Sequence, residues 1–269
     1  MQPFSPSFTR HPRWRGIGIV VPYDFVLDAE LWSWAREDVA LHLTRTPHLD
    51  AVVDIDMVKE ISDLAVVEAA SRDLSAAMPQ VTAYACTSGS FVRGLAGEAR
   101  LCDALRRGGA PLALTTSGAL LDALDALGVS TVSVATPYDE TLTKLLEAFL
   151  AEAGHETVGV ANLGLRERIA DVDTDGVMAL ARAAARDEAD ALFLSCTNLC
   201  TIDVIARLEA LLDRPVLSAN LVTMWASLRA ISALPTDRPE RLFQQAATTA
   251  SAGAGAVRRA GGLPGPAPA

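Results

Sequence analysis

In the segment Ala83-Tyr84-Ala85-Cys86-Thr87-Ser88-Gly89-Ser90, a short apolar run stops at a cysteine and passes at once into small hydroxyl residues and glycine. A later segment, Leu192-Phe193-Leu194-Ser195-Cys196-Thr197-Asn198, repeats this pattern. Each predicts a buried strand that ends in Cys-Thr before a helical pattern begins. Open α/β sheets bind ligands at the carboxyl ends of their strands, so we expect both cysteines at such a site.

Each of these strands lies downstream of another apolar strand, which runs into Pro-Tyr-Asp. The first loop is Pro22-Tyr23-Asp24 and the second is Pro137-Tyr138-Asp139. Tyr23 precedes Cys86 by 63 positions, and Tyr138 precedes Cys196 by 58. The sequence therefore predicts two similar halves, each of which places one cysteine and one tyrosine loop at the carboxyl ends of its strands.

Strands and helices alternate along the chain, which predicts parallel sheets with right-handed crossovers. The fold class is α/β, with two pseudo-symmetric Rossmann-like lobes and the site at the lobe interface. Each lobe is expected to hold a four-stranded parallel sheet flanked by helices. The expected strands are 17–21, 39–45, 81–85, 111–115, 131–135, 157–161, 191–195 and 215–218. The expected helices are 28–36, 56–78, 91–105, a helix capped by Ser117 that runs to 127, 140–153, 174–185, 202–212 and 221–231.

Composition and the strand count suggest four segments. Residues 1–15 hold three prolines and no periodicity, so we expect a loose arm. The first lobe should span 16–128, with an exchange of its last helix onto the other lobe allowed, and the second should span 129–243. The tail at 244–269 is rich in Ala, Gly and Pro and buries too little apolar surface to order itself, so we expect it to be disordered.

The charge balance restricts the partners. The 23 Lys and Arg are outnumbered by 33 Asp and Glu, which argues against nucleic-acid binding. No signal segment or membrane-spanning run is recognisable, so we expect a cytoplasmic protein with free thiols and no membrane partner. A small anionic substrate remains allowed, because backbone N–H groups and helix amino ends can hold it. A homo-oligomer is also allowed.

No cofactor or metal motif is evident. The four histidines are scattered, and Cys196 and Cys200 would need two further ligands at a comparable spacing to form a structural zinc site. Neither G-x-G-x-x-G nor G-x-x-x-x-G-K occurs, and Lys59 and Lys144 fall within amphipathic helices. We therefore expect chemistry without metal or cofactor.

The two Cys-Thr sites suggest acid–base chemistry on one small molecule. The amino end of a following helix should lower the pKa of each thiol toward thiolate. Two thiols that face each other across a cleft could act on opposite sides of one carbon atom. The hydroxyls of Thr87, Ser88, Thr197 and Tyr138 are suited to hold a carboxylate or an enediolate.

At this level of detail the chain resembles the aspartate/glutamate racemase superfamily, in the branch of maleate cis-trans isomerase and arylmalonate decarboxylase. The resemblance covers roughly residues 16–234. It rests on four motifs, A-C-T-S-G-S-F-x-R-G from 85, L-G-V-x-x-V-x-V-A-T-P-Y from 127, V-D-T-D at 172–175 and L-S-C-T-N-L-x-T-I-D-x-I from 194.

The resemblance implies that Cys86 and Cys196 flank the reacting carbon. The decarboxylases keep only the second cysteine and have glycine where Cys86 stands, so retention of both favours isomerisation or racemisation. In maleate isomerases one cysteine adds to the double bond and the adduct rotates before elimination. By resemblance, Tyr138 and Asn162 match the isomerase pocket, and Thr87, Ser88 and Tyr138 match the decarboxylase's carboxylate-binding group.

One departure from the isomerase pattern concerns the loop after the first strand. The isomerases carry Asn there, whereas this chain reads Pro22-Tyr23-Asp24-Phe25. Tyr23 and Asp24 are candidate substrate-binding residues, although Asp24 could instead cap the next helix and Asn162 could support a turn. We expect Cys102 to pack in the core. For Cys200 we expect a packing role, a role in capping a helix, or a position that lines the pocket.

The leading hypothesis is a cofactor-independent isomerase or racemase of a small carboxylate or dicarboxylate. One alternative is a decarboxylase in which Cys196 protonates an enediolate. A third hypothesis, from another class, is a non-catalytic carboxylate-binding protein.

Overall fold

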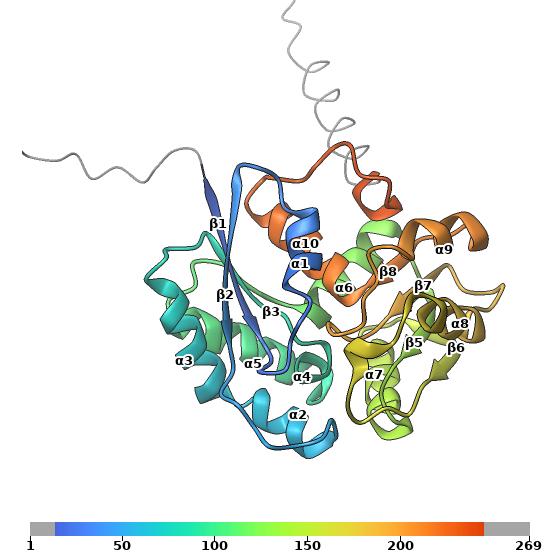
Figure 1. Ribbon diagram of the computed structural model, residues 1–269, viewed down its shortest axis with the longest axis horizontal. Coiled ribbons are helices and arrows are strands. Elements are labelled where there is room, and N and C mark those ends of the chain that lie inside the picture. Colours follow the sequence, from blue (N-terminus) through green and yellow to red (C-terminus); the bar gives the residue numbers. More distant parts are fainter. Residues whose placement is uncertain (1–13, 245–269) are drawn as a thin grey trace, which may run out of the picture.

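A computed structural model describes residues 14–244, and the expected arm and tail lie almost entirely outside these residues. The chain forms two four-stranded parallel sheets, with the strand orders β2-β1-β3-β4 and β6-β5-β7-β8. Figure 1 shows the sheets in separate lobes, each flanked by helices. The predicted α/β fold with four strands in each half is confirmed. The strands are β1 (Arg15–Val21), β2 (Val39–Arg45), β3 (Val81–Tyr84), β4 (Ala113–Thr115), β5 (Thr131–Thr136), β6 (Glu156–Asn162), β7 (Ala191–Leu194) and β8 (Val216–Ser218).

Strand register brings the predicted loops together. In the first sheet Ile19 of β1 pairs with Ala83 of β3, and in the second sheet Val134 of β5 pairs with Phe193 of β7. All pairs are parallel, so the carboxyl ends of neighbouring strands lie at one edge of each sheet. At this edge of the first sheet lie the Tyr23 loop after β1 and the Cys86 loop after β3. At the same edge of the second sheet lie the Tyr138 loop after β5 and the Cys196 loop after β7.

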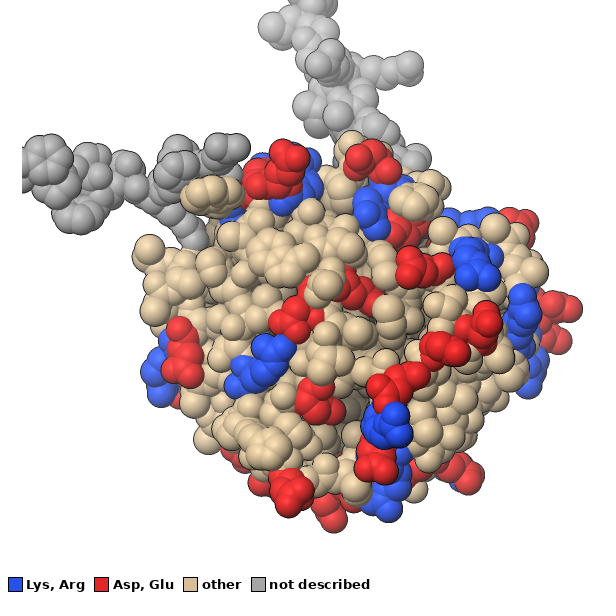
Figure 2. Space-filling model, in the orientation of Figure 1, with Lys and Arg blue, Asp and Glu red and all other residues tan. Residues whose placement is uncertain are grey.

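Helices cover the sheets, with α3 against β1 and β2 and α8 against β5 and β6. Among residues 14–244, no helix has the length and apolar character needed to cross a membrane. On the face shown in Figure 2, acidic and basic side chains are intermixed rather than gathered in one basic surface. The helices are α1 (Asp28–Trp34), α2 (Ile55–Ile61), α3 (Leu64–Ser75), α4 (Thr87–Phe91), α5 (Gly94–Arg107), α6 (Thr116–Leu127), α7 (Glu140–Glu152), α8 (Thr174–Ala184), α9 (Ile205–Leu212) and α10 (Ala219–Ala230), with a 3-10 turn η1 (Ile169–Asp171).

The prediction of a single long helix at 56–78 is wrong. The chain forms α2 and α3 instead, because the side chain of Asp63 caps a new helix by accepting hydrogen bonds from the amides of Ala65 and Val66 at 2.9 and 3.3 Å. The apolar spacing continues across this break, so periodicity alone could not locate it.

The helix expected at 91–105 is also divided. Gly94 has a φ of +65°, a left-handed conformation that separates the short α4 from α5. The cap assigned to Ser117 belongs to Thr115, whose hydroxyl accepts a hydrogen bond from the amide of Gly118 at 2.9 Å. The Ser117 hydroxyl instead lies 2.7 Å from that of Ser90, so it ties α6 to the Cys86 loop.

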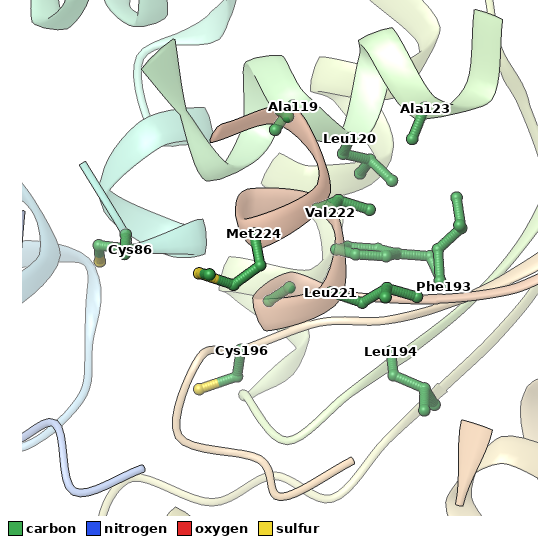
Figure 3. Packing of buried hydrophobic residues seen from close by; sticks show 14 of the residues in the cluster. Cys86, Ala119, Leu120, Ala123, Phe193, Leu194, Cys196, Leu221, Val222 and Met224 are labelled. Atoms are coloured by element: carbon green, nitrogen blue, oxygen red, sulfur yellow. The ribbon is translucent and has the colours of Figure 1, made fainter. Parts of the chain in front are cut away.

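Helices α6 and α10 join the two halves. They pack against each other, and α10 also contacts β3 and β4 of the first sheet, so the last helix of the second half reaches onto the first lobe. Figure 3 shows Ala119, Leu120 and Ala123 of α6 beside Leu221 and Val222 of α10. The contacts of α6 with a sheet are to β4 of its own lobe, whereas α10 contacts strands of both sheets.

A buried glutamate on α1, Glu30, forms hydrogen bonds with residues of the second half of the chain. Glu30 is 5% exposed, and its Oε1 accepts hydrogen bonds from Thr201 Oγ1 at 2.7 Å and Asn220 Nδ2 at 3.2 Å. Its Oε2 accepts a hydrogen bond from the Thr201 amide at 3.0 Å. Asn220 also donates to the carbonyl of Thr197 at 2.9 Å, so Glu30 helps to hold the segment that follows Cys196.

Replacing Glu30 with alanine should destabilise the fold by about 3 kcal/mol, because the amide of Thr201 and the side chain of Asn220 lose a buried acceptor. Urea unfolding measures the change, and Glu37→Ala, at an exposed position nearby, serves as the control. Equal midpoints for the two variants would contradict this account of the lobe contact.

Candidate functional site

The two cysteine loops meet at one narrow cavity of about 30 Å3. It lies between the lobes, and Figure 3 shows the sulfur atoms of Cys86 and Cys196 directed toward the space between their loops. Such a volume holds about one water molecule, so the structure shows a closed site. Seven of the nine residues predicted for the site line it, namely Asp24, Cys86, Thr87, Ser88, Tyr138, Cys196 and Thr197.

Cys86 occupies the N-cap position of α4. Its Sγ accepts a hydrogen bond from the amide of Gly89 at 3.4 Å and lies 3.8 Å from Ser88 Oγ. A Cβ atom at position 89 would clash with the hydroxyl of Tyr84 and lie 3.1 Å from the Cys86 sulfur, so this turn requires glycine. The backbone around the first thiol is therefore tightly determined.

Cys196 has a left-handed backbone, with a φ of +88°. This conformation is costly for a residue with a Cβ atom and persists where the surroundings hold it in place. The surroundings here include the hydrogen bond from Asn220 to the carbonyl of Thr197 and those from Thr201 to Glu30. The second thiol is thus placed by contacts that reach into the first lobe.

The prediction that the thiol pKa values are lowered is wrong for this closed state. Burial raises the pKa of Cys86 to about 11 and that of Cys196 to about 12. The amide of Gly89 does stabilise the Cys86 thiolate, but loss of water outweighs it. Both cysteines are therefore neutral thiols at pH 7 in the closed cavity.

Two hydroxyl groups line this cavity, and that of Tyr138 is hydrogen-bonded to Cys196. Burial raises the pKa of Tyr138 well above its usual value, so its phenol stays protonated and can donate. Thr87 Oγ1 is buried and has no hydrogen-bond partner among residues 14–244. A buried hydroxyl without a partner is costly, and a carboxylate bound in the cavity would satisfy it.

The structure places the other two predicted residues outside the cavity. Tyr23 directs its hydroxyl to the carbonyl of Ala51 at 3.2 Å, and its ring meets His48 edge-on. Asn162 is exposed at the end of β6, the edge strand of its sheet, which is separated from β7 by β5. Neither side chain is brought to the thiol pair.

Asp24 lines the cavity and does not cap the next helix, because the residue at the N-cap of α1 is Leu27. Sequence reasoning missed Asn198, whose side chain donates to the carbonyl of Asp24 at 3.1 Å and accepts from the amide of Val26 at 3.1 Å. The signal that could have identified Asn198 as a site residue is its position directly after Cys196-Thr197. The other lining residues that were missed are Pro22, Val53, Met57, Ile61 and Ile169.

The remaining cysteines lie apart from this site. Cys102 sits in α5 and its thiol donates to Glu98 Oε1 at 3.3 Å, in keeping with a packing role. Cys200 is partly exposed and does not line the cavity. Burial and the neighbouring Glu30 carboxylate raise its pKa to about 11.

One side of the cavity is closed by contacts between the lobes. The amide of Val53 donates to the carbonyl of Arg166 at 2.7 Å, and the Arg166 guanidinium pairs with Asp54 at 2.6 Å. Val53 itself lines the cavity. These contacts therefore hold the two lobes together beside the cavity.

The raised pKa values predict how the thiols respond to pH. Alkylation of Cys86 and Cys196 by iodoacetamide should accelerate about tenfold per pH unit from roughly pH 7 to 10, because the thiolate fraction keeps rising until the pH reaches the pKa. Mass spectrometry of the two peptides gives the rates. The urea-unfolded chain is the control, and its rates should level off near pH 9. A plateau below that pH in the folded protein would contradict the assignment.

Comparison with known proteins adds to this geometry. A family model described as arylmalonate decarboxylase matches residues 48–243. The arylmalonate decarboxylase of Bordetella bronchiseptica is 37% identical over 165 residues, covering 59% of this chain and 69% of that protein. A maleate isomerase of Nocardia farcinica is 28% identical over 257 residues, covering 88% and 99%. A crystal structure of the Nocardia farcinica maleate cis-trans isomerase, a cysteine-to-serine mutant with a covalently bound succinylcysteine intermediate, has a TM-score of 0.78 at 26% identity, covering 86% of this chain and 98% of that one.

Proposed function

The chain belongs to the arylmalonate decarboxylase family, and we propose that it is a cofactor-independent isomerase or racemase of a small carboxylate, with maleate cis-trans isomerase as the nearest mechanistic analogue. The relatives make it an enzyme of the group that holds maleate isomerases and arylmalonate decarboxylase. One observation carries the finer proposal, which is that two buried thiols from two lobes line a single cavity. A decarboxylation that protonates one face of a carbanion needs only one thiol.

For an isomerase, the proposed reaction uses one sulfur as nucleophile and the other as proton carrier. The nucleophilic thiol first releases its proton to bulk water, and its thiolate then forms a C–S bond to one alkene carbon. The second thiol gives its proton to the adjacent carbon, which leaves a single bond that can rotate. In the elimination the second sulfur takes back the carbon-bound proton, and the C–S bond breaks to regenerate the first thiolate for the next cycle, so atoms and charge balance.

The hydroxyl groups around the thiols would bind the substrate carboxylate. Thr87 Oγ1 needs a partner, and Ser88 and Thr197 lie in the same cavity wall. Tyr138 stays protonated and can donate to the oxygen that gains charge when the neighbouring carbon becomes an enediolate. These donors suit the same carboxylate in isomerisation, racemisation and decarboxylation.

A decarboxylase is the second candidate, and a specific observation favours it. The pKa of Cys196, near 12, keeps this thiol protonated at neutral pH, as a proton donor to an enediolate requires. In that reaction a substituted malonate loses CO2, and Cys196 then protonates the remaining carbanion. Cys86 would have no necessary role.

Replacing either thiol of the pair should separate these candidates. For an isomerase or racemase, Cys86→Ala and Cys196→Ala should each reduce kcat at least about a thousandfold, because each removes a group that forms or breaks a bond. Cys102→Ala is the matched control in α5. Proton NMR in D2O follows turnover of maleate, aspartate, glutamate, hydantoins and substituted malonates.

The same screen distinguishes the alternatives. Release of CO2 from a malonate with activity retained in Cys86→Gly would favour the decarboxylase. Tight binding without exchange, isomerisation or CO2 loss would favour a non-catalytic carboxylate-binding protein. Near-normal turnover in both alanine variants would overturn the two-thiol mechanism. Because the chemistry needs both thiols reduced, we also expect the protein to work in a reducing compartment such as the cytoplasm.

A further inference from the structure

The cavity contains an acidic side chain and no basic one. Asp24 lines it together with the two thiols, and none of the lining residues is Lys, Arg or His. No ion pair involves Asp24 in the described part of the chain, where twelve ion pairs are formed by other residues. A ligand therefore meets a carboxyl group whose charge no protein cation offsets.

The position of Asp24 is fixed from the second lobe. Asn198 binds the carbonyl of Asp24 and the amide of Val26, so the loop after β1 is held against the segment that follows Cys196. Burial raises the pKa of Asp24, and its charge in turn raises the pKa values of both cysteines. The carboxyl group thus lies within electrostatic reach of both reacting thiols.

This arrangement treats the two ends of a substrate differently. One end can be a carboxylate that receives hydrogen bonds from Thr87, Ser88 and Tyr138. A second carboxylate beside Asp24 would place two like charges in a site with little water, and one of them would have to take up a proton. A group that donates hydrogen bonds would instead meet an acceptor.

Building on the function proposed above, we propose that Asp24 is a specificity-determining residue and that the substrate is a monocarboxylate whose other end carries a hydrogen-bond donor, such as an amide, a hydroxyl or an ammonium group. On this reading maleate and other dicarboxylates are disfavoured. The protein discriminates between monocarboxylates and dicarboxylates when they bind, before any bond to sulfur forms.

Binding of two saturated compounds of matched size tests this without requiring turnover. Succinate has two carboxylates, and succinamate replaces one of them with an amide. The wild-type protein should bind succinamate at least about tenfold more tightly than succinate by isothermal titration calorimetry at neutral pH. Asp24→Asn should bring the two dissociation constants within about threefold of each other, because the amide side chain carries no charge and can also donate.

Asp50→Asn is the matched control, since it removes the same charge from an exposed position in the first lobe and should keep the wild-type ratio. Thermal melting checks that each variant is folded. Equal binding of both compounds by wild type, an unchanged ratio in folded Asp24→Asn, or no binding of either compound would each overturn the proposal. If the ratio behaves as expected but the NMR screen finds no reaction, the selectivity stands and the proposed enzymatic function fails.

Discussion

The contact of the Glu30 carboxylate with the second lobe is the interaction on which the site depends most directly. Each lobe supplies one cysteine, so the thiols oppose each other only while the lobes keep a fixed relation. Glu30 reaches from α1 to Thr201 and Asn220, and Asn220 continues the chain of hydrogen bonds to the residue after Cys196. One buried acid therefore links lobe packing to the backbone that follows Cys196.

Loss of water sets the chemical character of the closed site. It makes both thiols weak acids, and the buried hydroxyl of Thr87 has no partner among the residues that the structure describes. A site in this state is prepared for a ligand that supplies acceptors and for proton transfer by neutral groups. A free thiolate is disfavoured in this state, because burial raises the pKa values of both cysteines.

The fold and the paired cysteines could be predicted because both leave a local pattern. Buried parallel strands are continuous apolar runs, and the Cys-Thr ends repeat in each half. The break at Asp63 and the left-handed Gly94 could not be located from periodicity, which continues across both. The thiol pKa values were misjudged because the depth of burial is a property of the assembled lobes. In addition, the helix expected soon after Cys196 begins only at Ile205, so it does not start at this thiol. Asn162 was misplaced relative to the thiols because strand order, which puts β6 at an edge, is not encoded locally.

The ion pair between Arg166 and Asp54 connects the second lobe to a wall of the cavity. Both side chains are partly solvated, and such pairs contribute only about 0–1 kcal/mol. Asp54 also caps α2 through the amides of Asp56 and Met57, so any movement of this carboxylate is transmitted to a helix that forms the cavity wall. A substitution at Arg166 would therefore act on the cavity wall through Asp54 and α2 without touching either thiol.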